Sequence, residues 1–119
     1  MALVTAAPGL TNIVTAIAGA YLESRELLVI GGQVKTEDLS YGKLRQNGIQ
    51  EISGVDMVKN ICNSFVRVLD TWGKEKLFKE INYSTNGRKG PVFLEIPIDI
   101  QARNIDFNFV GIFEMSLYL

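Results

Sequence analysis

Residues 4–12 constrain the fold more than any other part of the chain, because a short apolar run leads there into Pro8-Gly9 and the start of a helix. Proline fixes φ, and glycine accepts backbone conformations that other residues resist, so this pair predicts a tight turn. A strand that ends in a glycine-containing turn at a helix N-terminus is where open α/β sheets bind ligands. The segment therefore predicts a binding site at the turn.

Strands and helices are predicted to alternate along the rest of the chain. An apolar stripe at helical spacing covers residues 10–23, and shorter helices are predicted at 55–61 and 74–83. Apolar runs predict strands at residues 1–5, 27–30, 65–69 and 92–96, and residues 35–48 are predicted to form a loop. The run 27–30 is expected to end at Gly31-Gly32. This alternation predicts an α/β fold with an open parallel sheet flanked by helices.

Composition excludes several classes of protein. The chain has no histidine and one cysteine, Cys62, so a structural zinc site and an internal disulfide are both excluded, and a reducing compartment is favoured. A formal net charge of −1 gives no support for a nucleic-acid partner. Residues 1–22 carry no charged side chain, but Pro8, Gly9 and Asn12 argue against a membrane span there. We expect a cytoplasmic protein with no membrane partner.

Four blocks of sequence carry a resemblance to a known family. They are residues 4–12 (VTAAPGLTN), Gly32-Gln33-Val34, Gln50-Glu51, and residues 87–97 (GRKGPVFLEIP) followed by Asp99-Ile100-Gln101. In this order they resemble the N-terminal pyrimidine-binding domain of thiamine-diphosphate enzymes, with the acetolactate synthase large subunits as the nearest group. The family pattern has Ser-Gly where this chain has Ala6-Ala7, and the plant and bacterial synthases have Pro where it has Lys35.

The resemblance implies a cofactor site. Thr5, Pro8, Gly9 and Asn12 are expected to line the pocket for the aminopyrimidine ring of thiamine diphosphate, with Gln50 beside the pyrimidine amino group or the substrate. It further implies a 2-keto acid substrate and a homo-oligomer, with the small residues of helix 10–23 at the subunit interface. From the residues alone, the surface of Ala16, Gly19 and Ala20 fits helix-on-sheet packing equally well.

The resemblance also implies that this chain is a fragment. Residues 1–103 are expected to form an incomplete pyrimidine-binding domain, and residues 104–119 a linker or a non-native tail. The family's catalytic glutamate precedes the first block, and the domain that binds Mg²⁺ and diphosphate is a separate one, so no catalytic or metal-binding residue is assigned here. The chain alone is expected to be inactive. The alternative is a non-catalytic remnant or a partner-binding α/β module.

Simpler roles are also open for several of these residues. Thr11 and Asn12 could satisfy the free N–H groups of a helix start, and Gln50-Glu51 could be a solvated pair in a loop. A catalytic base needs a raised pKa, and nothing around Glu51 in the sequence indicates an apolar pocket. Cys62 is expected to be a small core residue.

Overall fold

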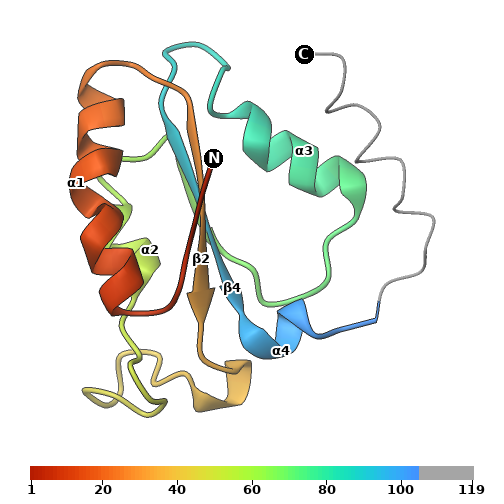
Figure 1. Ribbon diagram of the computed structural model, residues 1–119. Coiled ribbons are helices and arrows are strands. Elements are labelled where there is room, and N and C mark those ends of the chain that lie inside the picture. The colour runs from red at the N-terminus through yellow and green to blue at the C-terminus, as the bar shows by residue number, and fades with distance from the viewer. Residues whose placement is uncertain (105–119) are drawn as a thin grey trace.

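The computed structural model describes residues 1–104, in which four parallel strands form one open sheet with helices on both faces (Figure 1). The strands are β1 (Ala2–Val4), β2 (Leu27–Gln33), β3 (Ser64–Arg67) and β4 (Pro91–Pro97). The helices are α1 (Pro8–Leu22), the 3₁₀ turn η1 (Thr36–Asp38), α2 (Gly54–Val58), α3 (Lys74–Asn82) and α4 (Ile98–Gln101). The predicted α/β class with an open parallel sheet is confirmed. Residues 105–119, nearly all of the predicted tail, lie outside the described residues.

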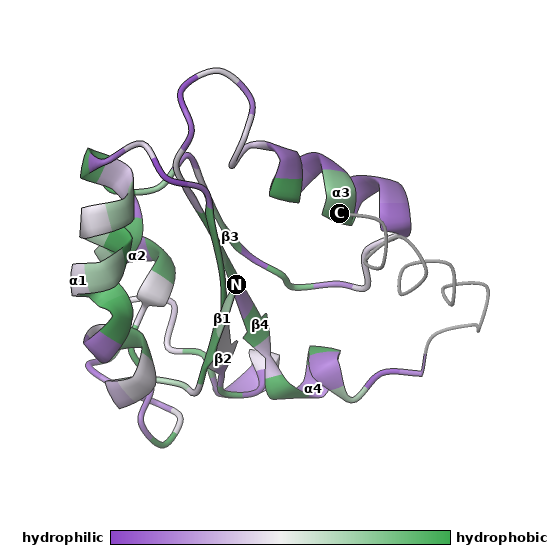
Figure 2. Ribbon diagram, turned by 45° about the horizontal axis from the view of Figure 1, so that its top comes forward, coloured by the Kyte–Doolittle hydropathy of each residue, from purple (hydrophilic) through white to green (hydrophobic). Residues whose placement is uncertain are grey.

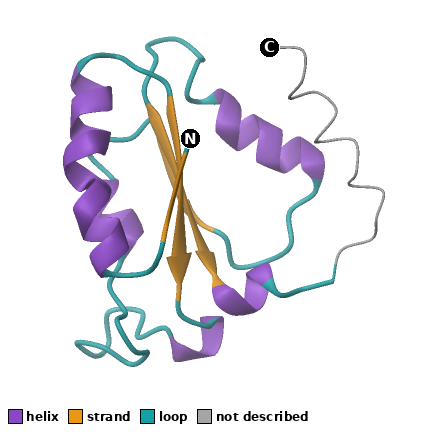
Figure 3. Cartoon of the chain, in the orientation of Figure 1, coloured by secondary structure: helices purple, strands orange, loops and turns teal. Residues whose placement is uncertain are grey.

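The strand order is β1-β2-β4-β3, with every neighbouring pair parallel. Val4 is in register with Gly31, and the pairing of β2 with β4 runs from Leu27 opposite Pro91 to Gln33 opposite Pro97. The chain thus leaves β1, β2 and β4 at the same edge of the sheet. In Figure 3 the loops that follow these strands, and the short helices η1 and α4, gather at that edge.

The hydrophobic core lies between the sheet and the helices α1 and α2. Its central buried side chains come from both helices, two strands and the segment after α2: Leu10, Ile17, Val29, Val58, Cys62 and Phe93. Ile13 and Val14 of the predicted helical stripe pack against this cluster. The expected core role of Cys62 is confirmed, and burial raises the pKa of its thiol to about 12.

The turn into α1 falls earlier than the sequence analysis placed it. The chain reverses at Ala6-Ala7, and Pro8 is the first residue of the helix. The proline ring suits this position, because its missing N–H belongs to the helix start, where N–H groups have no intrahelical acceptor. Ala7 takes a φ of 47°. The prediction of a turn at Pro8-Gly9 was therefore wrong by two residues.

Strand β2 also runs further than predicted. Gly31 and Gly32 do not end it, and the strand continues to Gln33. Gly31 lies where the strand passes closest to α1, and a Cβ there would sit 2.3 Å from Leu10 Cδ2 and 3.1 Å from Phe93 Cζ. The glycine at this position allows close packing of helix on strand rather than a turn.

The second face of the sheet is turned toward α3 (Figure 2), which buries none of its residues fully. Figure 2 shows α3 as a largely hydrophilic helix standing apart from the sheet. A hydrogen bond from Ser64 Oγ to Glu80 Oε2 at 2.7 Å ties it to the start of β3. The connection that follows α3 is closed by the Gly90 N–H, which donates to the Ser84 carbonyl at 3.0 Å. Near the β1 edge this face stays open, and Leu3 is 76% exposed.

Candidate functional site

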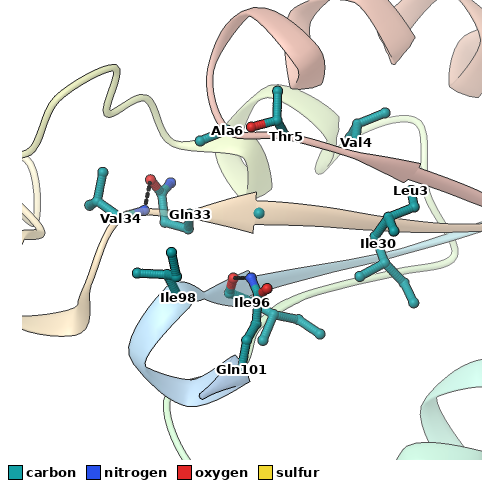
Figure 4. Close-up of a pocket in the computed structure, with 11 residues that line it drawn as sticks. Leu3, Val4, Thr5, Ala6, Ile30, Gln33, Val34, Ile96, Ile98 and Gln101 are labelled. Atoms are coloured by element: carbon teal, nitrogen blue, oxygen red, sulfur yellow. Dashed lines mark hydrogen bonds between the residues drawn. The ribbon is translucent and has the colours of Figure 1, made fainter.

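A cavity of about 590 Å³ opens at the carboxyl edge of the sheet (Figure 4). It lies at the ends of β1, β2 and β4, and its floor is mostly apolar, with Leu3, Ile30 and Ile96 among the lining side chains. Thr5 and Gln101 supply polar side chains at its rim. Gln33 also lines it but is only 4% exposed, and its amide is bound to Ile52, Glu95 and the Val34 N–H. The Gln101 amide donates to the Ile96 carbonyl at 2.7 Å, which ties α4 back to the end of β4. An apolar cavity with a few convergent polar groups is the usual form of a small-molecule site.

The turn between β1 and α1 forms one wall of this region. Gly9 allows the turn to close on Thr5, since a Cβ at position 9 would lie 2.9 Å from Thr5 Cγ2. No side chain caps the start of α1: the Thr11 hydroxyl donates backward to the Pro8 carbonyl at 3.1 Å, and Asn12 is exposed. The helix-cap interpretation of Thr11 and Asn12 is therefore wrong.

Of the predicted site residues, the cavity lining includes only Thr5. Pro8, Gly9 and Asn12 lie in the first two turns of α1 directly after it. Gln50 is exposed and does not line the cavity. It lies in the loop from residue 39 to residue 53, the η1–α2 loop, which Figure 1 shows at the same edge of the sheet. Its φ is 56°, a left-handed conformation that is uncommon for a residue other than glycine.

The η1–α2 loop is folded around Glu51. The carboxylate accepts hydrogen bonds from the backbone N–H and hydroxyl of Ser40, both at 2.7 Å, and from the N–H groups of Asn47 at 2.8 Å and Gly48 at 3.2 Å. Burial alone would raise the pKa of Glu51, but these donors outweigh it and lower the pKa from 4.5 to about 2. Glu51 thus holds the loop as an anion at neutral pH. The solvated-pair interpretation is wrong for Glu51, although Gln50 beside it is exposed.

The sequence analysis missed a buried polar cluster beside the site. Glu95 of β4 is 0% exposed and accepts from Gln33 Nε2 at 3.0 Å, from the Gly54 N–H at 2.8 Å, and from Arg67 Nε in a close ion pair. Arg67 also donates to Ser53 Oγ at 3.2 Å. We call these five residues the Glu95 cluster. A charged residue within an otherwise apolar strand was the signal available in the sequence, since buried charges are almost always paired.

Neither a metal site nor a membrane span is found in the part of the chain that the structure describes. No group of three or more His, Cys, Asp or Glu side chains among residues 1–104 is placed to hold a metal ion. No helix within the same residues is long and apolar enough to cross a membrane.

Comparison with known proteins identifies the family. Residues 1–57 match the family described as thiamine pyrophosphate enzyme, N-terminal TPP binding domain. The chain is 33% identical to an acetolactate synthase large subunit of Buchnera aphidicola over 109 residues, covering 91% of this chain and 18% of that relative. The corresponding enzyme of Lactococcus lactis is 36% identical over 104 residues, 87% of this chain and 17% of the relative.

A relative with a different name matches equally well. A 2-hydroxyacyl-CoA lyase 2 of Danio rerio is 36% identical over 102 residues, 83% of this chain and 15% of the relative. The chain thus spans less than a fifth of the length of each of these relatives. The matched residues 1–57 contain β1, α1, β2 and the η1–α2 loop, so they include every predicted site residue. The chain belongs to the thiamine pyrophosphate enzymes, as part of their N-terminal TPP binding domain, and is acetolactate-synthase-like in sequence.

Proposed function

We propose that this chain binds the aminopyrimidine half of thiamine diphosphate at the carboxyl edge of its sheet, as part of an acetolactate-synthase-like enzyme. One observation supports the proposal. The residues that match the TPP binding family include Thr5, Pro8, Gly9, Asn12 and Gln50, and all five fall in the segments that follow β1 and β2 in the chain. An open parallel sheet binds its ligands outside the carboxyl ends of its strands, where this turn and this loop lie.

The local geometry fits a flat heteroaromatic ring. The apolar floor of the cavity offers Leu3 and Ile30 for contact with a ring face, and Thr5 supplies a hydroxyl at its wall. The start of α1 has no side-chain cap and no acidic residue in its first turn, so it is open to an electron-rich ligand atom. The close approach of Gly9 to Thr5 keeps the turn narrow enough for ligand atoms to contact its backbone.

The two kinds of relative favour cofactor binding over any single reaction. A synthase and a lyase match this chain at the same 36% identity, so the shared residues serve something that the two enzymes have in common. The family description names TPP binding as that common property. We therefore propose that other parts of the whole protein select the substrate. By analogy with the synthases we propose a 2-keto acid as substrate, with the bound cofactor supplying the chemistry for its decarboxylation and two-carbon transfer.

The remaining properties follow from the same family analogy. We propose that Mg²⁺ and the diphosphate group are bound by a separate pyrophosphate-binding domain, and that the enzyme acts in the cytoplasm as a homo-oligomer. The surface of α1 supports a subunit contact, because Ala16 and Gly19 are exposed and Ala20 is half-buried. Apart from the nearby backbone of the helix itself, no described atom lies within 4 Å of a Cβ built on Gly19. That surface faces away from the sheet, which disfavours the alternative of helix-on-sheet packing.

Titration of the ¹⁵N-labelled chain with thiamine tests the binding proposal, because thiamine carries the pyrimidine without the diphosphate. We expect amide shifts at residues 5–12 and around Gln50, with a Kd of about 1 mM, equivalent to about −4 kcal/mol, for so small a contact. Asn12→Leu should weaken the interaction several-fold. Asn82→Leu is the matched control, since it makes the same change on the exposed end of α3, away from this edge.

The proposal fails if thiamine leaves residues 5–12 unshifted up to its solubility limit, or if Asn12→Leu and Asn82→Leu behave alike. The alternative of a partner-binding module predicts self-association without any effect of thiamine. Sedimentation of the wild-type chain and of Gly19→Leu, with and without thiamine, separates the two functions. A large side chain on the small-residue surface should block a subunit contact while leaving the thiamine shifts in place.

A further inference from the structure

We propose that Glu95 is a positioning residue, which through the Glu95 cluster fixes residues 52–54 and with them the approach of Gln50 to the site. The relevance of Gln50 rests on the proposed function; the placement of the loop does not. Three consecutive residues, the last two of the η1–α2 loop and the first of α2, are each held by a different member of the cluster. Gln33 Nε2 donates to the Ile52 carbonyl at 2.7 Å, Arg67 donates to Ser53 Oγ, and Glu95 accepts from the Gly54 N–H.

Glu95 is the centre of this arrangement because three of the other four members of the cluster donate to it, and the fourth, Ser53, is held through Arg67. Its Oε1 accepts from both Gln33 and Gly54, and its Oε2 accepts from Arg67. Each of these donors would lose its acceptor if the carboxylate were removed, at a depth where water does not replace it. One buried carboxylate therefore sets the orientation of two side chains that in turn hold the loop.

The close packing around Gly54 restricts the backbone where the loop enters α2. A Cβ at position 54 would lie 2.6 Å from Glu95 Oε1, 2.8 Å from Leu10 Cδ1 and 3.0 Å from Phe93 Cζ. The backbone thus enters α2 in direct contact with the carboxylate and with the core. At its other side the loop presses Gly48 against Val34, where a Cβ would lie 2.7 Å from Val34 Cγ1. Gln50 lies between these two fixed points, in its left-handed conformation.

An ion pair that served only stability would explain why Glu95 and Arg67 are in contact. It would not explain why both also hydrogen-bond residues where the η1–α2 loop joins α2. Replacing a buried ion pair by apolar side chains of similar size is often neutral or stabilising, so stability alone does not require Glu95 and Arg67. What apolar side chains cannot supply is an acceptor for the Gly54 N–H and a donor for Ser53. The two roles therefore separate experimentally: an apolar pair can restore stability, but it cannot restore the anchoring of the loop.

Amide hydrogen exchange of the 119-residue chain measures that anchoring directly. Glu95→Gln should raise exchange at residues 50–54 by about 10- to 100-fold, the usual effect of losing a hydrogen bond to a charged group, relative to the central amides of β2 and β4. Glu80→Gln is the matched control. It removes a carboxylate that bonds Ser64 on the other face of the sheet, and should leave the loop unchanged.

The double variant Glu95→Leu/Arg67→Met keeps the test informative if Glu95→Gln fails to fold. We expect its thermal midpoint to return to near the wild-type value while residues 50–54 keep their fast exchange. Loop exchange that recovers together with stability would overturn the proposal, because the cluster would then act only through stability. Unchanged loop exchange in Glu95→Gln would overturn it as well.

Thiamine titrations of the same variants separate this inference from the proposed function. If thiamine shifts residues 5–12 in the wild type, and Glu95→Gln weakens the shifts around Gln50 more than those at the turn, both are supported. If thiamine never binds but Glu95→Gln still loosens residues 50–54, the cofactor proposal fails and the positioning role is supported. If thiamine binds and Glu95→Gln changes neither affinity nor loop exchange, the positioning role fails alone.

Discussion

The two neighbouring glycines of β2 should respond in opposite directions to the same substitution. Gly31→Ala places a methyl group 2.3 Å from Leu10 Cδ2, on the face that packs against α1. Gly32→Ala points to the opposite face, where the nearest atom is the Ala6 nitrogen at 3.5 Å, an ordinary van der Waals contact. Both changes remove the same backbone freedom from the unfolded chain, so the comparison isolates crowding in the core.

The expected magnitudes follow from these distances. A glycine in a strand is less stable than alanine by about 0.5–1 kcal/mol, so Gly32→Ala should raise the free energy of unfolding by about that amount. Gly31→Ala has the same gain but adds overpacking of about 1–3 kcal/mol, because Leu10 is 1% exposed and has little room to move. The two variants should therefore differ by roughly 5–15 °C in Tm, with Gly31→Ala the less stable.

Urea denaturation followed by far-ultraviolet circular dichroism gives both free energies, and the double variant Leu10→Ala/Gly31→Ala checks the cause. Shortening Leu10 alone should destabilise by about 2–5 kcal/mol, but together with Gly31→Ala the loss should be smaller than the sum by about 1 kcal/mol or more. Equal effects of Gly31→Ala and Gly32→Ala, or additive effects in the double variant, would refute the packing argument.

Three further outcomes are expected. The pKa of Glu51 is lower in the folded state than in the unfolded state, so its stabilisation is present above pH 4.5 and is lost as the pH falls toward 2. The free energies of unfolding of the wild type and of Glu51→Gln, measured by denaturation, should therefore converge over that range. Cys62, with its pKa raised to about 12, should react slowly with a thiol reagent at pH 8 in the native chain and quickly in denaturant; fast native reaction would contradict its burial. Ala7→Val places a β-branched side chain at a φ of 47° and should lower the thermal midpoint by several degrees, whereas Ala6→Val, without that constraint, should have a much smaller effect.

Local patterns in the sequence were enough to predict the class of fold and the main elements, although not the short helices η1 and α4. The stripe formed by Leu10, Ile13 and Ile17 repeats at helical spacing, and β4 is apolar apart from Glu95. Each pattern therefore indicates the burial of its own segment without reference to the rest of the chain. The motif order predicted the family for the same reason, because each block is a local pattern. The comparisons confirm the family, while the roles of Thr5, Pro8, Gly9, Asn12 and Gln50 stay predictions.

Contacts between distant residues were decided only by the tertiary structure. Whether Gly31 ends a strand or makes room for Leu10 depends on where α1 crosses β2. The polar cluster joins Glu95 to Gln33, 62 residues away in the sequence, and to Arg67, 28 residues away. Periodicity carries information over a few residues. The partner of a buried charge is set by strand order and register, which bring these side chains to one place.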